Sequence, residues 1–224
     1  MSRRRAAGDT PEPWMSATWQ AASLLLGYPD DELREQLPLL RSVTDRLPDD
    51  VARPLAAVVA HLTSTPVPEA AAAYVETFDH RRRCCPYLTY HAYGDTRKRG
   101  MALLRFKQEY TAAGLRLSDD ELPDHLAVVL EFAALGDAVR GRQLMLDHRA
   151  GVELLRLALE DAGSVYAEVL SAVCATLPEL PSQDRETVLR LAAEGPPAEE
   201  VGLQPFAPPE YMPQTAPEKT GGRR

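Results

Sequence analysis

Apolar residues recur at helical spacing along most of this 224-residue sequence, and this periodicity constrains the fold more than any other feature. Successive apolar side chains lie three or four positions apart, as in the first stripe, which holds Trp19, Ala22 and Leu26. Strict alternation over the roughly four to eight residues of a half-buried strand is hard to find. The pattern therefore predicts an all-α protein.

The start and end of several helices are predicted from residues that favour or disfavour helical backbone. The Gly27-Tyr28-Pro29-Asp30 sequence is expected to end one helix and begin the next. Pro38 lies inside that next helix and is expected to kink or break it, since proline lacks a backbone donor. Asp49 or Asp50 is expected to cap a third helix, and Pro123 suits the first turn of a later one.

Other segments divide into those with helical spacing and those without it. Helices are expected over 69–78, 96–115, 126–135 and 139–177, the last divided near Gly151 and Gly163, and a short one over 187–193. Residues 63–68 are expected to form a loop. Residues 80–95 contain an arginine triplet, two cysteines and three tyrosines, and are expected to be ordered but irregular.

The chain is predicted to form one domain with two unstructured ends. Residues 196–217 hold seven prolines, a composition that buries too little apolar surface to offset its ordering entropy. We therefore expect a disordered N-terminus over 1–13, a single-domain helical bundle of about eight to ten helices over 14–195, and a flexible proline-rich tail over 196–224.

Charge and hydropathy restrict the partners. With 25 basic and 33 acidic residues the net charge is -8, which argues against a nucleic-acid partner and favours a cationic peptide.

The longest apolar run, 126–135, is ten residues and includes Glu131, so direct membrane insertion is not expected. The segment after Arg3-Arg4-Arg5 is polar, unlike an export signal. Three cysteines, two of them adjacent, indicate a reducing, cytoplasmic location.

Motifs that would indicate catalysis or metal binding are missing from the sequence. It has no glycine-rich phosphate loop and no nucleophile elbow. The nearest metal set is His80, Cys84, Cys85 and His91, but adjacent cysteines do not form the usual C-x2-C clamp, and two incidental thiols in a loop are the preferred interpretation. No metal ligand is assigned.

Two charged clusters have both a functional and a structural interpretation. Asp124 and His125, with Glu121 and Glu131 nearby, are the best acid–base candidates, but no nucleophile or cofactor motif accompanies them and no catalytic residue is assigned. The cations Arg97, Lys98, Arg99 and Arg105 form either a basic patch or an ion-paired, solvated helix face. The second alternative is preferred for an acidic protein.

Five segments form an ordered set of motifs that covers most of the expected domain. The first four are Leu24–Asp30, Tyr74–Asp79, Leu88–Tyr90 and Gly94–Ala102. The fifth consists of Leu122–Leu126 together with Leu130–Phe132. Together they resemble the nitrate reductase molybdenum cofactor assembly chaperones, within the wider group of maturation chaperones for redox enzymes with twin-arginine or related leaders.

The resemblance implies an all-helical chaperone and not an enzyme. It implies a protein that binds the immature nitrate reductase alpha subunit, alone or in an alpha–beta complex, through the N-terminal leader. The client would stay competent for insertion of bis-molybdopterin guanine dinucleotide before membrane assembly, and the chaperone would bind no cofactor stably. Recognition would place an amphipathic leader helix in an apolar groove with acidic groups at its rim.

The resemblance also assigns roles to individual residues. It implies polar client contacts by Asp124, His125 and Glu131, and apolar anchoring by Tyr90 and Tyr93, with Arg97 as a further contact. The residues expected to build the structural motif are Tyr74, Phe78, Asp79, Gly94, Asp95, Pro123 and Leu126. The structural alternative places Asp124 as a helix cap and Phe78 and Leu126 in the core.

Two other classes of function stay open at this stage, besides a sister chaperone for a reductase of the dimethyl sulfoxide or trimethylamine N-oxide type. A helical scaffold would bind a folded partner through an exposed apolar face. An enzyme would need Asp124 and His125 to converge with a third group.

The Cys84-Cys85-Pro86 sequence departs from the family pattern and suggests a redox-sensitive loop. In the proline-rich tail, Phe206 and Tyr211 are candidate anchors to a partner or to the protein's own groove.

Overall fold

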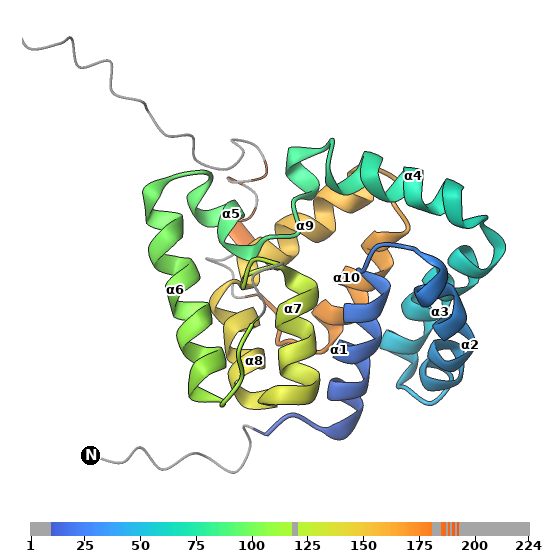
Figure 1. Ribbon diagram of the computed structural model, residues 1–224, viewed down its shortest axis with the longest axis horizontal. Helices are drawn as coiled ribbons and strands as arrows, with labels where there is room; N and C mark the ends of the chain where they lie inside the picture. The colour runs from blue at the N-terminus through green and yellow to red at the C-terminus, as the bar shows by residue number, and fades with distance from the viewer. Residues whose placement is uncertain are drawn as a thin grey trace, which may run out of the picture.

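The computed structural model describes residues 10–117, 121–180 and, beyond these, 185, 186, 188, 190 and 192. Over 13–175 the chain forms ten α-helices, and the part of the chain that the structure describes contains no strand, only an isolated bridge between Tyr87 and His125. The predicted all-α class is therefore confirmed (Figure 1). Three of the expected segments lie wholly or partly outside the described residues: the tail over 196–224, most of the N-terminal segment and four of the seven residues of the short helix over 187–193.

The helices follow one another with short connections. They are α1 (Pro13–Leu25), α2 (Asp31–Thr44), α3 (Asp49–Ser64), α4 (Val67–Phe78), α5 (Leu88–Tyr93), α6 (Arg97–Ala112), α7 (Leu126–Glu131), α8 (Ala138–Asp147), α9 (Arg149–Asp161) and α10 (Tyr166–Ala175). A 3-10 turn, η1 (Arg82–Cys84), precedes α5, and a π-helical turn, η2 (Phe132–Gly136), continues α7.

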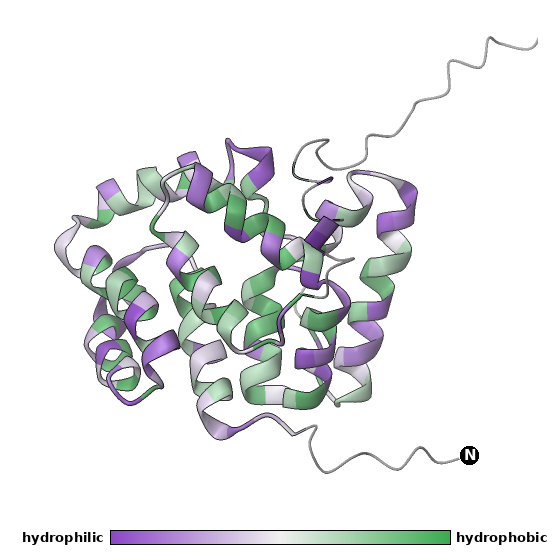
Figure 2. Ribbon diagram, turned by 180° about the vertical axis from the view of Figure 1, so that it is seen from behind, coloured by the Kyte–Doolittle hydropathy of each residue, from purple (hydrophilic) through white to green (hydrophobic). Residues whose placement is uncertain are grey.

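Helices α1 and α10 lie side by side and join the two halves of the bundle (Figure 1). On one side α10 packs on α3, which packs on α2; on the other, α1 packs on α7 and η2, and η2 packs on α8. Trp19 on α1 is fully buried, and its indole N–H donates to the hydroxyl of Thr176, just after α10, at 2.9 Å. Apolar residues gather on the inner faces of the helices (Figure 2), as the stripes predicted.

Two predictions about helix starts are confirmed or corrected at α2 and α3. Asp30 caps α2, because its side chain accepts from the backbone N–H of Leu33 at 2.8 Å. The expected cap by Asp49 or Asp50 is wrong: Pro48 is the N-cap, and both acids lie in the first turn of α3, where they face the positive end of the helix dipole.

Two predictions about helix interruptions also require correction. Pro38 does not break α2, which runs continuously past it. Pro38 is exposed, so water can hydrate the backbone carbonyl that loses its partner there. Similarly, Gly151 lies inside α9, and the division falls at His148 instead. A Cβ at Gly151 would lie 3.2 Å from the Leu88 carbonyl, so this glycine allows α9 to approach α5 closely.

Two loop predictions and one prediction of a helix start are also partly wrong. The segment 80–95 contains helix α5, a six-residue helix that tertiary packing stabilises, since Leu88 and Thr89 are buried. Pro123 does not enter the next helix but lies in the turn ahead of α7. The predicted 63–68 loop is reduced to Thr65 and Pro66. The predicted break near Gly163 is confirmed, and Gly163 has a φ of 65°, which favours glycine.

Candidate functional site

Two segments far apart in the sequence are joined immediately before α5 and α7. The backbone N–H of Leu88 donates to the carbonyl of Asp124 at 3.0 Å, and the N–H of Leu126 donates to the carbonyl of Pro86 at 2.9 Å. Tyr87 and His125 face each other across this pair of bonds as the isolated antiparallel bridge. The crossing fixes where both helices begin.

Asp124 is the buried polar centre of this crossing, with no exposed surface. Its Oδ2 accepts from the Thr89 backbone N–H at 3.1 Å and from the Thr89 hydroxyl at 2.5 Å, and lies 3.8 Å from Nη2 of Arg99. The Arg99 Nε–H in turn donates to the Thr89 hydroxyl oxygen at 3.2 Å. We call Thr89, Arg99 and Asp124 the polar hub; it ties α5, α6 and the turn before α7 together.

His125 caps the start of α7, which corrects the alternative that Asp124 does so. The Nδ1 atom of His125 accepts from the backbone N–H of Ala127 at 3.3 Å, so in this tautomer the ring proton is on Nε2. The ring packs edge-on against Tyr87, whose hydroxyl donates to Glu121 at 3.0 Å. Burial lowers the pKa of His125, against the opposing effect of Glu121 and Asp124, and this favours a neutral ring.

The predicted aromatic anchors differ in their exposure. Tyr90 is buried, and the Arg99 guanidinium lies 5.9 Å from its ring centre and 5.5 Å from that of Tyr87. Tyr93 is half-buried at the end of α5, and Arg97 is exposed at the start of α6.

The predicted structural-motif residues fall into two groups. The rings of Tyr74 and Phe78 are tilted by 48° with their centres 4.7 Å apart, near Tyr166, and the Tyr74 hydroxyl donates to the Leu26 carbonyl at 3.1 Å. Burial, with a smaller effect of Asp79, raises the pKa of Tyr74 to about 12.

The second group lies close to the hub. Gly94, with a φ of 55°, ends α5, and the exposed Asp95 lies 3.3 Å from Nη1 of Arg99. Pro123 and Leu126 are buried, and Phe78 and Leu126 belong to the core, as the structural alternative predicted. Asp79 is exposed at the end of α4.

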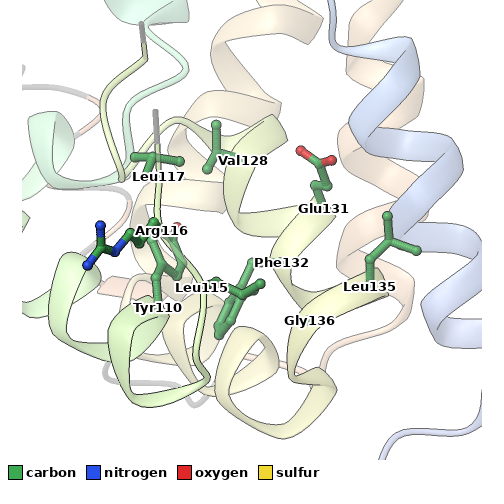
Figure 3. A pocket seen from close by; sticks show the side chains of 9 residues that line it. All are labelled: Tyr110, Leu115, Arg116, Leu117, Val128, Glu131, Phe132, Leu135 and Gly136. Atoms are coloured by element: carbon green, nitrogen blue, oxygen red, sulfur yellow. The ribbon is translucent and has the colours of Figure 1, made fainter. Parts of the chain in front are cut away.

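Glu131 lies away from the hub, at the rim of an apolar pocket of about 240 Å³. The pocket lies between the chain that follows α6 and the α7–η2 segment (Figure 3). Its lining is Tyr110, Leu115, Arg116, Leu117, Val128, Glu131, Phe132, Leu135 and Gly136. Figure 3 shows Glu131 and Leu135 at one side of the pocket and Arg116 at the other.

The π-helical turn shapes this pocket. Leu135, the last residue of the predicted 126–135 helix, is 71% exposed, and Leu115 opposite is 42% exposed. A Cβ at Gly136 would lie 2.7 Å from the Leu115 side chain and 2.8 Å from Phe132, so glycine makes room for both. Helix α8 fixes the turn from behind, because a Cβ at Gly141 would lie 2.5 Å from Cα of Ala133. π-Helical turns frequently occur at functional sites.

Tyr110 connects the pocket with the hub. Its ring contacts Phe132 in the pocket at 4.6 Å between centres, and its hydroxyl donates to the Pro123 carbonyl at 2.5 Å. Sequence reasoning assigned no role to Tyr110 or Thr89, and it placed Arg99 only in the basic cluster. Only the helical spacing of Tyr110 with Phe106 indicated that its ring faces inward.

The thiols and histidines of the 80–95 segment point in different directions. The Cys84 thiol lies 3.6 Å from the Ala158 carbonyl, His91 donates to the Cys85 carbonyl at 2.9 Å, and His80 pairs with Glu76. Burial raises the pKa of Cys85 to about 11, which makes its thiol a poor nucleophile at neutral pH. Over the described ranges no three histidine, cysteine or acidic side chains are grouped to hold a metal ion.

The preferred ion-pair interpretation of the basic cluster is confirmed for two of its members. Arg105 pairs with Asp147 at 2.5 Å and Arg99 with Asp95. Among the helices that the structure describes, none has the length and hydropathy to span a membrane.

A solved structure and several curated proteins are similar to this chain. A structure described as that of a redox enzyme maturation protein from Archaeoglobus fulgidus covers 76% of this chain and 96% of its own, with a TM-score of 0.54 and 22% identity. The nitrate reductase-like protein NarX of Mycobacterium tuberculosis is 39% identical over 75% of this chain, which spans only 26% of that protein.

Two shorter relatives match over more of their length. The probable nitrate reductase molybdenum cofactor assembly chaperone NarJ of Bacillus subtilis is 34% identical over 71% of this chain and 88% of its own. NarJ of Escherichia coli K12, also a nitrate reductase molybdenum cofactor assembly chaperone, is 34% identical over 65% of this chain and 63% of its own.

The fold is thus that of the all-helical maturation proteins, with a buried polar hub beside an apolar pocket. Residues 44–172 match the family model described as nitrate reductase delta subunit, and the chain belongs to that family. The resemblance predicted from the motifs is confirmed. The two NarJ relatives are named as assembly chaperones, which agrees with the predicted class of a chaperone.

Proposed function

We propose that this protein is a cytoplasmic, system-specific chaperone for the immature alpha subunit of a respiratory nitrate reductase. It binds the N-terminal leader of that subunit and keeps the subunit competent for insertion of bis-molybdopterin guanine dinucleotide before membrane assembly. Family membership and the named relatives support the class of function. The observation that carries the leader-binding part is the apolar pocket beside η2, with Glu131 at its rim.

The pocket offers apolar area that folding has left uncovered. Leu135 and Leu115 are large aliphatic side chains with much of their surface in water, and the ring of Phe132, from the same turn as Leu135, lies beside Leu115 (Figure 3). An amphipathic helix presents apolar side chains three and four residues apart, which suits a short groove of this kind. Burying one such leucine contributes up to about 1.5–3 kcal/mol. The apolar face of the leader therefore supplies most of the affinity.

Glu131 would determine the orientation in which a leader helix lies in the pocket. Its carboxylate is exposed at the rim, and Arg116 lies at the other side (Figure 3). A cationic residue of the leader next to Glu131 would add little affinity in water, but the reverse orientation would place it beside Arg116. We therefore assign to Glu131 the selection of orientation and of basic leaders, in keeping with a net charge of -8.

Asp124 and His125 act in this proposal as positioning residues. Asp124 has no exposed surface and His125 is 9% exposed, so a bound peptide would reach neither without opening the hub. They fix the start of α7, and the Tyr110 hydroxyl bond to Pro123 links that start to the pocket. The direct contact predicted for these two residues and for the buried Tyr90 stays a prediction, while Tyr93 and Arg97 are accessible at the outer ends of α5 and α6.

The cofactor in this proposal belongs to the client and not to the chaperone. The chaperone holds the alpha subunit, alone or in an alpha–beta complex, while the cofactor enters it, and binds none stably itself. Exposed apolar leader surface would otherwise associate prematurely, and covering it with a reversible partner prevents this.

The test is calorimetric titration with a peptide that copies the leader of the host's nitrate reductase alpha subunit, and with a scrambled peptide. We expect saturable binding of the true leader alone. Leu135→Ala should weaken it about fivefold, the loss expected for part of a buried leucine. Leu39→Ala is the matched control, because Leu39 is 66% exposed on α2, away from the pocket.

Three results would contradict the proposal in different ways. Binding only to the leader of a dimethyl sulfoxide or trimethylamine N-oxide reductase would show a sister chaperone with another client. Leader binding that Leu39→Ala weakens and Leu135→Ala does not would move the site away from the pocket. A folded but non-binding chain would favour the helical scaffold.

A further inference from the structure

Helix α6 is basic in an otherwise acidic protein. Its sequence carries five cations, Arg97, Lys98, Arg99, Arg105 and Lys107, against one acid, Glu109, a balance of +4 in a chain of -8. The helix lies at the edge of the bundle (Figure 1). On it Met101 is 71% and Leu104 50% exposed. Large apolar side chains in the middle of an exposed basic helix indicate a surface that another segment covers.

Four of these residues form one stripe. Lys98, Met101, Leu104 and Lys107 follow one another at intervals of three residues, so they form an oblique row across the outward half of the helix, with the two lysines at opposite edges of that half. All four side chains are exposed. The stripe, which we call the α6 face, is thus a cation, two apolar groups and a cation. Its two lysines are about 13.5 Å apart along the axis at the usual rise per residue.

The chain itself contains a segment of complementary order. Residues 191–218 hold five glutamates and no lysine or arginine. Within them Glu199 and Glu200 precede the apolar Val201, Leu203 and Phe206, and Glu210 follows. The order is acid, apolar, acid. We propose that the segment 199–210 of this chain docks on the α6 face, with its apolar residues on Met101 and Leu104 and its acids at the two lysines.

The connection to the described residues allows this contact. Val188 is 3% exposed and lines a cavity with Arg149 and Leu157 of α9. Helix α9 packs on α5, which packs on α6. Glu199 follows Val188 by eleven positions along the chain, enough to span about 36–40 Å when extended. A tethered segment has a high effective concentration, in the millimolar range for a short flexible connection, so contacts that are weak one by one suffice.

The thioether of Met101 is a local reporter of this contact. Hydrogen peroxide converts an accessible methionine to its sulfoxide, whereas a covered one reacts slowly. The full chain is treated with peroxide, and sulfoxide at Met101 is followed by peptide mass spectrometry, with the fully buried Met145 as internal reference. The same chain in urea gives the rate for uncovered Met101.

The variant combines Glu199→Gln, Glu200→Gln and Glu210→Gln. We expect Met101 in the wild type to react at least about fivefold more slowly than in urea, and the variant or 0.5 M salt to remove most of this protection, since exposed ion pairs are weak and screened. Phe206→Ser should act in the same direction. The matched charge control is Glu32→Gln, Glu35→Gln and Glu168→Gln, three exposed acids on α2 and α10, which should leave the rate unchanged.

Two results would overturn the proposal. If Met101 reacts as fast in the folded wild type as in urea, then no segment covers it. Slow reaction that both tail variants leave unchanged means that something other than this segment covers it, and a dilution series then reports whether that is a second copy. Neither result depends on leader binding, so failure here and failure of the proposed function are distinguishable.

Discussion

At the scale of single residues, the polar hub shows how a short hydrogen-bond set fixes a site from a distance. Asp124 accepts two bonds from Thr89, 35 residues earlier in the chain, and lies beside Arg99. Its other oxygen, Oδ1, and Nη2 of Arg99 are buried and have no hydrogen-bond partner among the described residues. A buried carboxylate with few partners carries a desolvation cost in the folded state, and removing it leaves its buried donors unpaired, which lowers stability further.

Removal of the Asp124 carboxylate should therefore destabilise the fold. Asp124→Ala leaves the Thr89 N–H and hydroxyl without their acceptor and removes the buried charge beside Arg99, and we expect a loss of about 3 kcal/mol in the free energy of unfolding, measured by urea denaturation. Asp95→Asn is the matched control, because this acid pairs with the same arginine at the surface and should change stability by less than about 1 kcal/mol. Equal effects of the two variants would show that the hub does not hold the fold.

Stability should also fall on mild acidification because of buried histidines. Burial lowers the pKa of His91, His125 and His148 below 6.5, so the unfolded chain binds protons that the folded chain does not. Their contribution is complete above about pH 6.5 and is lost as the pH falls below it. His125→Asn keeps a helix-capping side chain and should reduce the loss of stability between pH 7.5 and 5, as measured by urea midpoints. An unchanged pH dependence would contradict a neutral, buried His125.

At the scale of elements, two helical glycines differ in what surrounds them. At Gly141 a Cβ would meet the backbone of Ala133 at 2.5 Å, whereas at Gly100 on α6 it would meet nothing within 4 Å. The first glycine is required by the close packing of α8 against η2. The second only adds flexibility to its helix.

Alanine at these two positions should therefore have opposite effects. Gly141→Ala should lower stability by about 1–3 kcal/mol, because backbone cannot move aside as a flexible side chain can. Gly100→Ala should raise it by about 0.5–1 kcal/mol through helix propensity. Thermal unfolding followed by circular dichroism measures both. A stabilised Gly141→Ala would show that η2 moves easily away from α8.

The helices were more predictable from the sequence than the site, for a physical reason. The stripe of Trp19, Ala22 and Leu26 is local, since the period of one helix determines which side is buried. Capping by Asp30 was predictable for the same reason. By contrast, the pairing of Thr89 with Asp124 and the approach of Gly141 to Ala133 depend on where distant elements meet. Composition and spacing contain little of that information.

At the scale of the whole molecule, α1 and α10 connect the two halves of the bundle through Trp19 and Thr176. Neither half has a core that is independent of these two helices. We therefore predict one cooperative unfolding transition, in which tryptophan fluorescence and helical circular dichroism change at the same urea concentration. Thr176→Val should shift both signals together by about 1–2 kcal/mol, since it leaves the buried indole N–H without an acceptor. Separate transitions would contradict the single domain.

The bond between Trp19 and Thr176 spans 157 residues, and this separation has a consequence for biosynthesis. The indole of Trp19 cannot reach its final environment until the ribosome has released nearly all of the bundle. At about 5–20 residues per second, that interval is roughly 8–30 s. Throughout it, the side chains of α1 that are fully buried in the folded protein, such as Trp19 and Leu25, lack the partner that is made last, and the helix is itself a substrate for the cell's general folding machinery.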